Sequence, residues 1–202
     1  MKILNLKQGS TVWLETRLEH FTASEAVAMM GASPYQTRDA LLLEKFTDQC
    51  PEVSDFQQQI FDKGHAAEKA ALPHIEAQTG LEFYPVCGTL EVEGLPLMAS
   101  FDGLTMCESV CFEHKIWNEK KAELLTEQGL LPMYYWQLEH QLLVSGADKV
   151  IFLMSSGDIQ DAHILIEYES LPERRAGLIR GWHQFKAELE SVTPPTPKKP
   201  KP

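Results

Sequence analysis

Three residues of the chain have types and a spacing that suit a divalent metal ion. Asp102 ends one β-rich run, and Glu113 and Lys115 lie in the next. Because alternate residues of a strand point to the same face, Glu113 and Lys115 project together while His114 points away. If the two runs pair as a hairpin around the turn at residues 104–109, Asp102 comes to lie beside Glu113.

Two adjacent carboxylates repel each other unless a hard cation neutralises their charge. Oxygen ligands favour Mg²⁺, for which Mn²⁺ can substitute. Such an ion would activate water and neutralise a phosphate group, and Lys115 would hold the attacking water or lower its pKa. Charged pairs of this kind also occur as plain decoration of exposed strands. Here, however, Asp102 and Glu113 each follow an apolar or aromatic segment, and charges at buried strand ends need a partner or a metal.

The hydrophobic pattern predicts the elements that would position these residues. We expect helices over residues 10–20, 22–30, 37–50, 55–79, 118–128, 132–144 and 172–189. We expect strands over residues 81–86, 88–94, 96–103, 109–117, 149–155 and 162–169. Thr22 to Glu25 has the pattern of a capping box, and Pro73 is expected to kink or divide its helix. This order of elements predicts an α/β fold with a central mixed sheet and helices on both faces.

Composition indicates an ordinary globular protein. The chain has 202 residues, of which 44% are hydrophobic and 23% charged, and we expect one domain over residues 1–192. The tail at 193–202, TPPTPKKPKP, is expected to be disordered. No apolar run approaches the ~20 residues that span a bilayer, and the N-terminus lacks a signal-peptide pattern. We therefore expect a cytoplasmic protein without a membrane partner.

Charge and cysteine content narrow the possible functions. The net charge of −11 argues against a protein that coats nucleic acid by bulk electrostatics. It still allows an enzyme whose basic residues are confined to one channel. The four cysteines lack CxxC spacing and lie in hydrophobic segments, so buried thiols are favoured over zinc ligands or a disulfide framework.

The order of the motifs resembles the lambda-type phage alkaline exonucleases, the YqaJ-like viral recombinase family of PD-(D/E)xK nucleases. The resemblance covers about residues 7–190 and rests on four motifs. These are Gln8-Gly9 with Trp13, Arg17 and Thr22-Ala23-Ser24; Gly64 to Glu68; Asp102-Gly103 with Glu113-His114-Lys115; and Tyr135, Gln137, Glu139 and Gln141. Four motifs in the family's order are far more specific than any one of them.

The resemblance implies a restriction-endonuclease-like fold and a magnesium-dependent catalytic site. Asp102, Glu113 and the backbone carbonyl of His114 would bind the metal, with two ions expected per site. Glu68 would join the metal site or orient its waters. Lys115 would act in catalysis near the metal rather than as a ligand.

The resemblance also implies a site for the DNA end. Arg17, helped by the Ser24 hydroxyl, would hold the 5′-terminal phosphate. Gln137 would hydrogen-bond Lys115 or the attacking water. The family's second glutamine falls at Glu139 unless Gln141 takes that role, and the extra carboxylate of Glu139 could alternatively touch a second metal.

The activity implied is 5′–3′ exonuclease digestion of the 5′-ended strand of double-stranded DNA to mononucleotides, leaving 3′ overhangs for phage-type recombination. The implied partners are duplex DNA ends, two further copies of the chain in a homotrimeric ring, and a single-strand annealing protein in the cytoplasm of a bacterial host. Lys120, Lys121 and Lys149 are candidates for the basic channel. The alternatives are another PD-(D/E)xK nuclease, such as an endonuclease or an iron–sulfur exonuclease, and an inert DNA-end-binding scaffold.

Overall fold

Two parallel strands in the interior of the sheet carry apolar side chains on both faces. In β6 (Lys149–Ser155), Phe152 belongs to one hydrophobic core, and its neighbours Ile151 and Leu153 belong to the other. Neighbouring residues of a strand point to opposite faces, so this pattern requires cover on both sides of the sheet. The computed structural model, which describes residues 1–48 and 54–191, supplies that cover with helices.

The described strands form one mixed sheet. They are β1 (Lys2–Leu4), β2 (Phe21–Thr22), β3 (Tyr84–Val92), β4 (Leu95–Leu104), β5 (Val110–Ile116), β6 and β7 (Ile164–Glu169). Their order is β1-β3-β4-β5-β6-β7, and β2 pairs with β4. The β5–β6 and β2–β4 pairs are parallel, and the other pairs are antiparallel.

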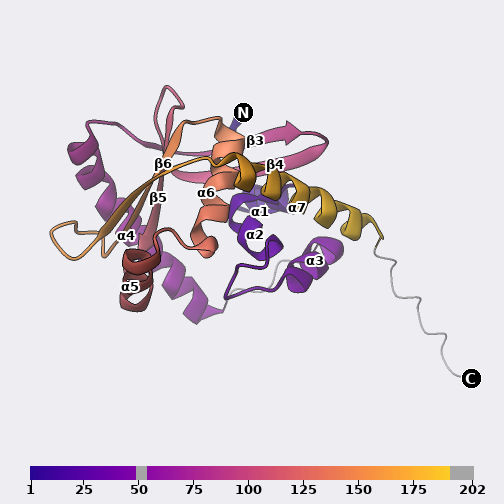
Figure 1. Cartoon of the computed structure of the whole chain (residues 1–202), viewed down its shortest axis with the longest axis horizontal. Coiled ribbons are helices and arrows are strands. Elements are labelled where there is room, and N and C mark those ends of the chain that lie inside the picture. Colours follow the sequence, from indigo (N-terminus) through magenta and orange to yellow (C-terminus); the bar gives the residue numbers. More distant parts are fainter. Residues whose placement is uncertain (49–53, 192–202) are drawn as a thin grey trace, which may run out of the picture.

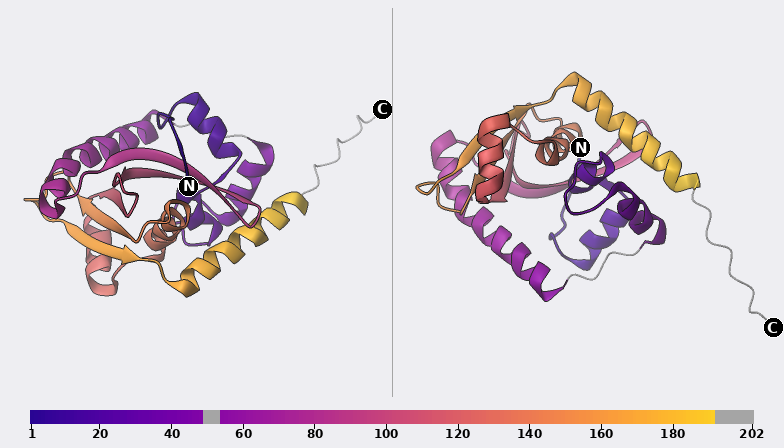
Figure 2. Two further views of the ribbon diagram at one scale, coloured as in Figure 1. Left: turned by 90° about the horizontal axis from the view of Figure 1, so that it is seen from above. Right: turned by 60° about the horizontal axis from the view of Figure 1, so that its bottom comes forward.

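Helices lie on both faces of this sheet (Figures 1 and 2). They are α1 (Thr11–Leu18), α2 (Ala23–Met29), α3 (Arg38–Thr47), α4 (Asp55–Thr79), α5 (Glu119–Gln128), α6 (Pro132–Ser145) and α7 (Pro172–Ser191). Helix α4 packs Ala71 and Ile75 into the smaller core, whereas α2, α6 and α7 pack into the larger core on the other face. The predicted α/β class, with a mixed central sheet of the restriction-endonuclease type and flanking helices, is confirmed.

Several predicted boundaries were wrong in the strand region. The runs at 81–86 and 88–94 were expected to be separate strands but form the single strand β3. Gly88 pairs with Ala99 of β4 in an unbroken ladder, and the irregularity instead lies between Tyr84 and Val86, beside Pro85. A proline lacks the N–H that a ladder needs, so the register shifts there rather than at the glycine. The short strands β1 and β2 were not predicted.

The helices agree more closely with the sequence. Pro73 does not divide α4, which continues from Asp55 to Thr79. The expected capping box is present at the start of α2, where the Glu25 carboxylate accepts from the Thr22 N–H at 3.0 Å. Helix α3 ends at Thr47, before the predicted end at 50. Residue 50 and the predicted tail at 193–202 lie outside the described residues.

The cysteines only partly follow the expectation of buried thiols. Cys87 and Cys111 are buried and free, but Cys107 is free and exposed, because it lies in the turn between β4 and β5. Cys50 is outside the described residues. In the part of the chain that the structure describes, no helix combines the length and apolar character needed to cross a membrane.

Candidate active site

The ends of β4 and β5 bring Asp102 and Glu113 together. Gly103 pairs with Phe112 in this antiparallel ladder, so the next step along the register sets Asp102 opposite Glu113. There the strands separate, and the His114 N–H donates at 2.8 Å to the Asp102 carboxylate instead of to a β4 carbonyl. The N–H and C=O of one strand residue point to the same neighbouring strand, so the His114 carbonyl is also directed toward β4.

Glu113 is the best supported side chain of the site. It is 2% exposed, and Lys115, two residues further along β5, contacts its Oε1 at 2.5 Å. Gln137 of α6 donates to the same oxygen at 2.7 Å, and Gln141 donates to Oε2 at 2.6 Å. Residues four apart lie on one helix face, so a single face of α6 fixes both oxygens of this buried carboxylate.

The expected position of Gln137 needs one correction. Its amide was predicted to hydrogen-bond Lys115 or the attacking water. In the structure it binds Glu113, to which Lys115 also binds, and a contact with the attacking water stays a prediction. Gln141, not Glu139, takes the place of the second glutamine. Spacing alone could not decide between Glu139 and Gln141, because the two residues are only about half a helical turn apart in the alignment with the family pattern.

Glu139 lies on the opposite face of α6 and does not reach the metal site. Its buried carboxylate accepts from Tyr168 at 2.6 Å, from Ser170 at 2.5 Å and from Arg175 at 2.6 Å. These residues belong to β7, α7 and the segment between them. The suggestion that Glu139 touches a second metal is therefore wrong: it ties α6 to β7 and α7.

The surroundings of Asp102 and Glu68 disfavour the charged forms of both carboxylates. Burial raises the pKa of Asp102 well above its usual value, and the nearby charges of Glu113 and Glu68 raise it further. Burial also raises the pKa of Glu68, and Glu113 adds to this shift. Burial lowers the pKa of Lys115, but attraction to Glu113 and Asp102 outweighs this effect, so its pKa lies above the ordinary value. The ammonium is therefore charged and offsets only part of the negative charge.

The residues present fit a magnesium ion with few protein ligands. Among residues 1–48 and 54–191, no three His, Cys, Asp or Glu side chains gather closely enough to hold a metal between them. Asp102 and Glu113 are the pair predicted to hold the ion, and Glu68 is near enough for its charge to raise the pKa of Asp102. Mg²⁺ is commonly held by one or two carboxylates and otherwise by water and phosphate oxygens. The buried Oε1 of Gln141 has no hydrogen-bond partner in the described structure, so an acceptor for such a water is present.

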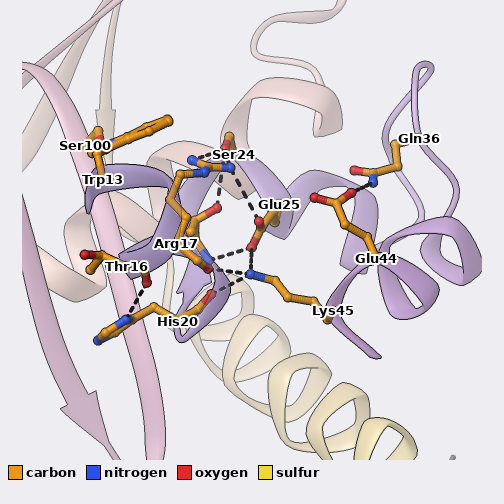
Figure 3. Close-up of polar contacts among 11 residues, drawn as sticks. Trp13, Thr16, Arg17, His20, Ser24, Glu25, Gln36, Glu44, Lys45 and Ser100 are labelled. Carbon is orange, nitrogen blue, oxygen red and sulfur yellow. Dashed lines mark hydrogen bonds and ion pairs between the residues drawn. The ribbon is translucent and has the colours of Figure 1, made fainter. Parts of the chain in front are cut away.

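A second polar cluster lies at the start of the chain (Figure 3). The Arg17 guanidinium of α1 approaches the exposed Ser24 hydroxyl of α2 at 3.4 and 3.5 Å. The structure thus brings together the two residues predicted to bind a phosphate. The guanidinium lies over the Trp13 ring, 4.6 Å from its centroid, and the Trp13 indole N–H donates to Ser100 at 3.1 Å.

This cluster is connected directly to the metal site. Ser100 lies on β4 two residues before Asp102, a separation of roughly 7 Å along a strand. Gln141, which supports Glu113, also donates to the Ser100 carbonyl at 3.3 Å. A chain of contacts through Trp13, Ser100 and Gln141 therefore links Arg17 to Glu113.

Two residues of the second cluster were not predicted. Glu25 was interpreted only as a capping residue, and Lys45 of α3 was not singled out. Lys45 lies 3.0 Å from Glu25, whose other oxygen is 3.4 Å from Arg17. The sequence did contain one indication that Lys45 is buried and paired. It lies one helical turn after Leu41, which is fully buried, and a lysine on an apolar helix face needs a partner.

Two of the three lysines predicted for a DNA channel, Lys121 and Lys149, have partners of their own. Lys149 is paired with Glu167 at 2.9 Å. Lys121 donates to the Tyr35 hydroxyl at 2.6 Å, which connects α5 to the loop between α2 and α3. This second contact lies on an exposed surface, since Tyr35 is 78% exposed.

Comparison with known proteins places this architecture in a family. A model of the YqaJ-like viral recombinase domain matches residues 12–148. The solved alkaline exonuclease of Laribacter hongkongensis has a similar fold, with 22% identity, a TM-score of 0.71 and coverage of 90% of this chain and 93% of that chain. A phage-related exonuclease from Haemophilus somnus is similar over 88% of this chain and 98% of that chain, with 11% identity and a TM-score of 0.56. No curated protein matches the sequence. The chain belongs to the YqaJ-like viral recombinase family.

Proposed function

We propose that the chain is a Mg²⁺-dependent exonuclease that digests the 5′-ended strand of double-stranded DNA and leaves 3′ overhangs. The observation that carries the proposal is the buried Glu113, which is held by Gln137, Gln141 and Lys115 beside Asp102. A carboxylate fixed at both oxygens and crowded by a second carboxylate is arranged for a cation. The match to the YqaJ-like viral recombinase family supports nuclease chemistry.

The residues of the site would divide the work of phosphodiester hydrolysis. Asp102, Glu113 and the His114 carbonyl would hold Mg²⁺, for which Mn²⁺ can substitute, and we expect two ions per site. The metal would supply charge neutralisation at the phosphate and a lowered pKa of bound water. Lys115, one-third exposed, would hold the attacking water, while Glu68 orients neighbouring waters. The water oxygen forms a bond to phosphorus as the bond to the 3′ oxygen of the terminal nucleotide breaks.

Arg17 and Ser24 would set the polarity of digestion by binding the 5′-terminal phosphate. A guanidinium presents paired donors that match phosphate oxygens. The connection through Trp13 and Ser100 to β4 keeps this anchor at a fixed position relative to Asp102, so that the first internal phosphodiester reaches the carboxylates. Each cycle would then release a mononucleotide. The similar alkaline exonuclease of Laribacter hongkongensis has been solved in complex with dAMP.

We also propose that the working unit is a homotrimeric ring around the duplex. With a net charge of −11, a monomer lacks the bulk positive charge that would keep it on DNA through many cycles. A closed ring stays on the DNA because it encloses the duplex. Cyclic closure requires one patch of the chain to meet a different patch of its neighbour. The 3′ overhang would pass to a single-strand annealing protein.

Digestion of end-labelled DNA tests the proposal. A linear duplex labelled at the 5′ end should release labelled mononucleotide at once in Mg²⁺, whereas a 3′ label should stay in long products. Closed circular duplex should remain intact, and EDTA should stop all release. Cleavage of the circle would instead indicate an endonuclease of the same superfamily. Absence of any metal-dependent cleavage would indicate an inert DNA-end-binding protein.

A further inference from the structure

Lys45 of α3 is a cation buried behind the Arg17 site, where the proposed function gives it no role. Its side chain is 3% exposed, and the Glu25 side chain that it faces is 7% exposed. Besides contacting Glu25 at 3.0 Å, its ammonium donates to the carbonyls of Arg17 and His20, each at 2.7 Å. The Lys45 ammonium therefore makes two hydrogen bonds and one ion pair.

Glu25 lies between this buried cation and Arg17 (Figure 3). One of its oxygens contacts Lys45 at 3.0 Å, and the other lies 3.4 Å from the Arg17 guanidinium. The contacts of Arg17 with Ser24, at 3.4 and 3.5 Å, are equally long. Charge-assisted hydrogen bonds of a guanidinium are usually ~2.7–2.9 Å. Arg17 is therefore positioned by Glu25 without being closely paired to it.

We propose that Lys45 is a positioning residue for the recognition of the 5′-phosphate, which it serves by neutralising Glu25. The inference rests on the proposed role of Arg17. With Lys45 present, the charges of Lys45, Glu25 and Arg17 sum to one positive charge, which is available to an anion. Without it they sum to zero, and a buried carboxylate that has lost its cation would draw the Arg17 guanidinium into a close pair. Lys45 also fixes the backbone at Arg17 through its carbonyl.

The test compares ends that differ only in the phosphate. The measured quantity is kcat/KM for a linear duplex with a 5′-phosphate divided by that for the same duplex with a 5′-hydroxyl. Lys45→Met keeps the aliphatic stem and removes the ammonium. We expect this ratio to fall about tenfold, through a higher KM for phosphorylated ends, because a charge-assisted contact is weakened. The Kd of the phosphorylated duplex, measured by fluorescence anisotropy in EDTA, should rise by a similar factor.

A second substitution separates charge neutralisation from packing. Glu25→Gln removes the charge that Lys45 offsets, and its amide oxygen can still accept from the Thr22 N–H. In the double variant Lys45→Met/Glu25→Gln, Arg17 has no carboxylate to pair with. Discrimination, the kcat/KM ratio of 5′-phosphate to 5′-hydroxyl ends, should therefore return to within about threefold of the wild-type ratio. Arg38→Met is the matched control: it breaks the ion pair of α3 with Glu188 and leaves Glu25 untouched. Its discrimination should equal that of wild type.

The outcomes separate this inference from the proposed function. If Arg17→Ala discriminates as well as wild type, the phosphate site is assigned wrongly, and the role of Lys45 fails with it. If Arg17→Ala loses discrimination but Lys45→Met keeps it, the site stands and the inference is overturned. A double variant as poor as Lys45→Met would likewise overturn it, since Lys45 would then act through packing alone. Should Lys45→Met not fold, the double variant decides: discrimination near wild type supports the inference, and discrimination near that of Arg17→Ala refutes it.

Discussion

Asp102→Asn should make the metal-free protein more stable while abolishing cleavage. The register of the β4–β5 ladder sets Asp102 beside Glu113, one step beyond its last pair, and the Cβ atoms of directly opposed residues in an intact ladder are about 5 Å apart. Two negative charges at that distance repel by about 3 kcal/mol at an effective dielectric constant of about 20. Lys115 offsets part of this repulsion, and Asp102 is only partly buried. We therefore expect a gain of about 1–2 kcal/mol in the free energy of unfolding.

Asparagine is the informative replacement because it keeps an oxygen for the His114 N–H, which Asp102 accepts at 2.8 Å. Asp102→Ala removes the same charge and leaves that N–H without its acceptor, at a cost of roughly 1–3 kcal/mol. The alanine variant should therefore be less stable than the asparagine variant by that amount. The comparison separates charge repulsion from the hydrogen bond.

Thermal unfolding in EDTA at pH 8, followed by titration with Mg²⁺, measures both effects. A gain of 1–2 kcal/mol corresponds to a rise in Tm of roughly 2–8 °C for a domain of this size. Mg²⁺ should raise the Tm of the wild type, because it binds the folded state, and should leave the Tm of Asp102→Asn nearly unchanged. A variant less stable than wild type in EDTA, or an equal Mg²⁺ shift in both proteins, would refute this account of the site.

Three further predictions concern the catalytic lysine, acid stability and assembly. Lys115→Ala should lower the rate of cleavage by orders of magnitude while duplex-end binding in Ca²⁺ stays within about threefold; loss of binding would make Lys115 a phosphate anchor. Burial lowers the pKa of His140 to about 3, below its unfolded value of about 6.5, so the stability it contributes is present above pH 6.5 and lost as the pH falls toward 3. His140→Gln keeps an acceptor for the Trp182 indole. Between pH 7 and pH 5 its free energy of unfolding, measured in urea, should therefore fall by about 2 kcal/mol less than that of wild type. An equal fall in both proteins would contradict the lowered pKa of His140. Light scattering should give three times the monomer mass without DNA, and a monomer that digests processively would rule out the ring.

The sequence predicted the parts of the site that depend on local geometry. Asp102 and Glu113 are joined by a short turn, so their pairing follows from strand alternation and hairpin geometry. Glu113 and Lys115 are two residues apart on one strand, and their contact follows for the same reason. Arg17 and Ser24 were associated only through the family resemblance, because they lie on different helices whose packing no local pattern determines.

The contacts that sequence reasoning missed are set by tertiary packing. Lys45 reaches Glu25 across 20 positions of sequence, and nothing in the periodicity of α3 specifies which helix it will face. The short strand β2 exists because Phe21 and Thr22 pair with β4, and two residues are too few to show a period. The expected break between the runs at 81–86 and 88–94 is absent, because Gly88 retains the N–H that proline lacks and the ladder continues through it.

The contacts on the two faces of α6 hold the Glu113 carboxylate in place. On one face, Gln137 and Gln141 hold the oxygens of Glu113, so any rotation of the helix would move both donors. On the other face, the buried Glu139 carboxylate is fixed by Tyr168 and Arg175. Breaking such a buried charge network is strongly destabilising, so this network resists rotation of α6. An ordinary glutamine at position 139 would accept fewer charge-assisted bonds. The Glu139 carboxylate therefore strengthens the support of Glu113 from the opposite face of α6.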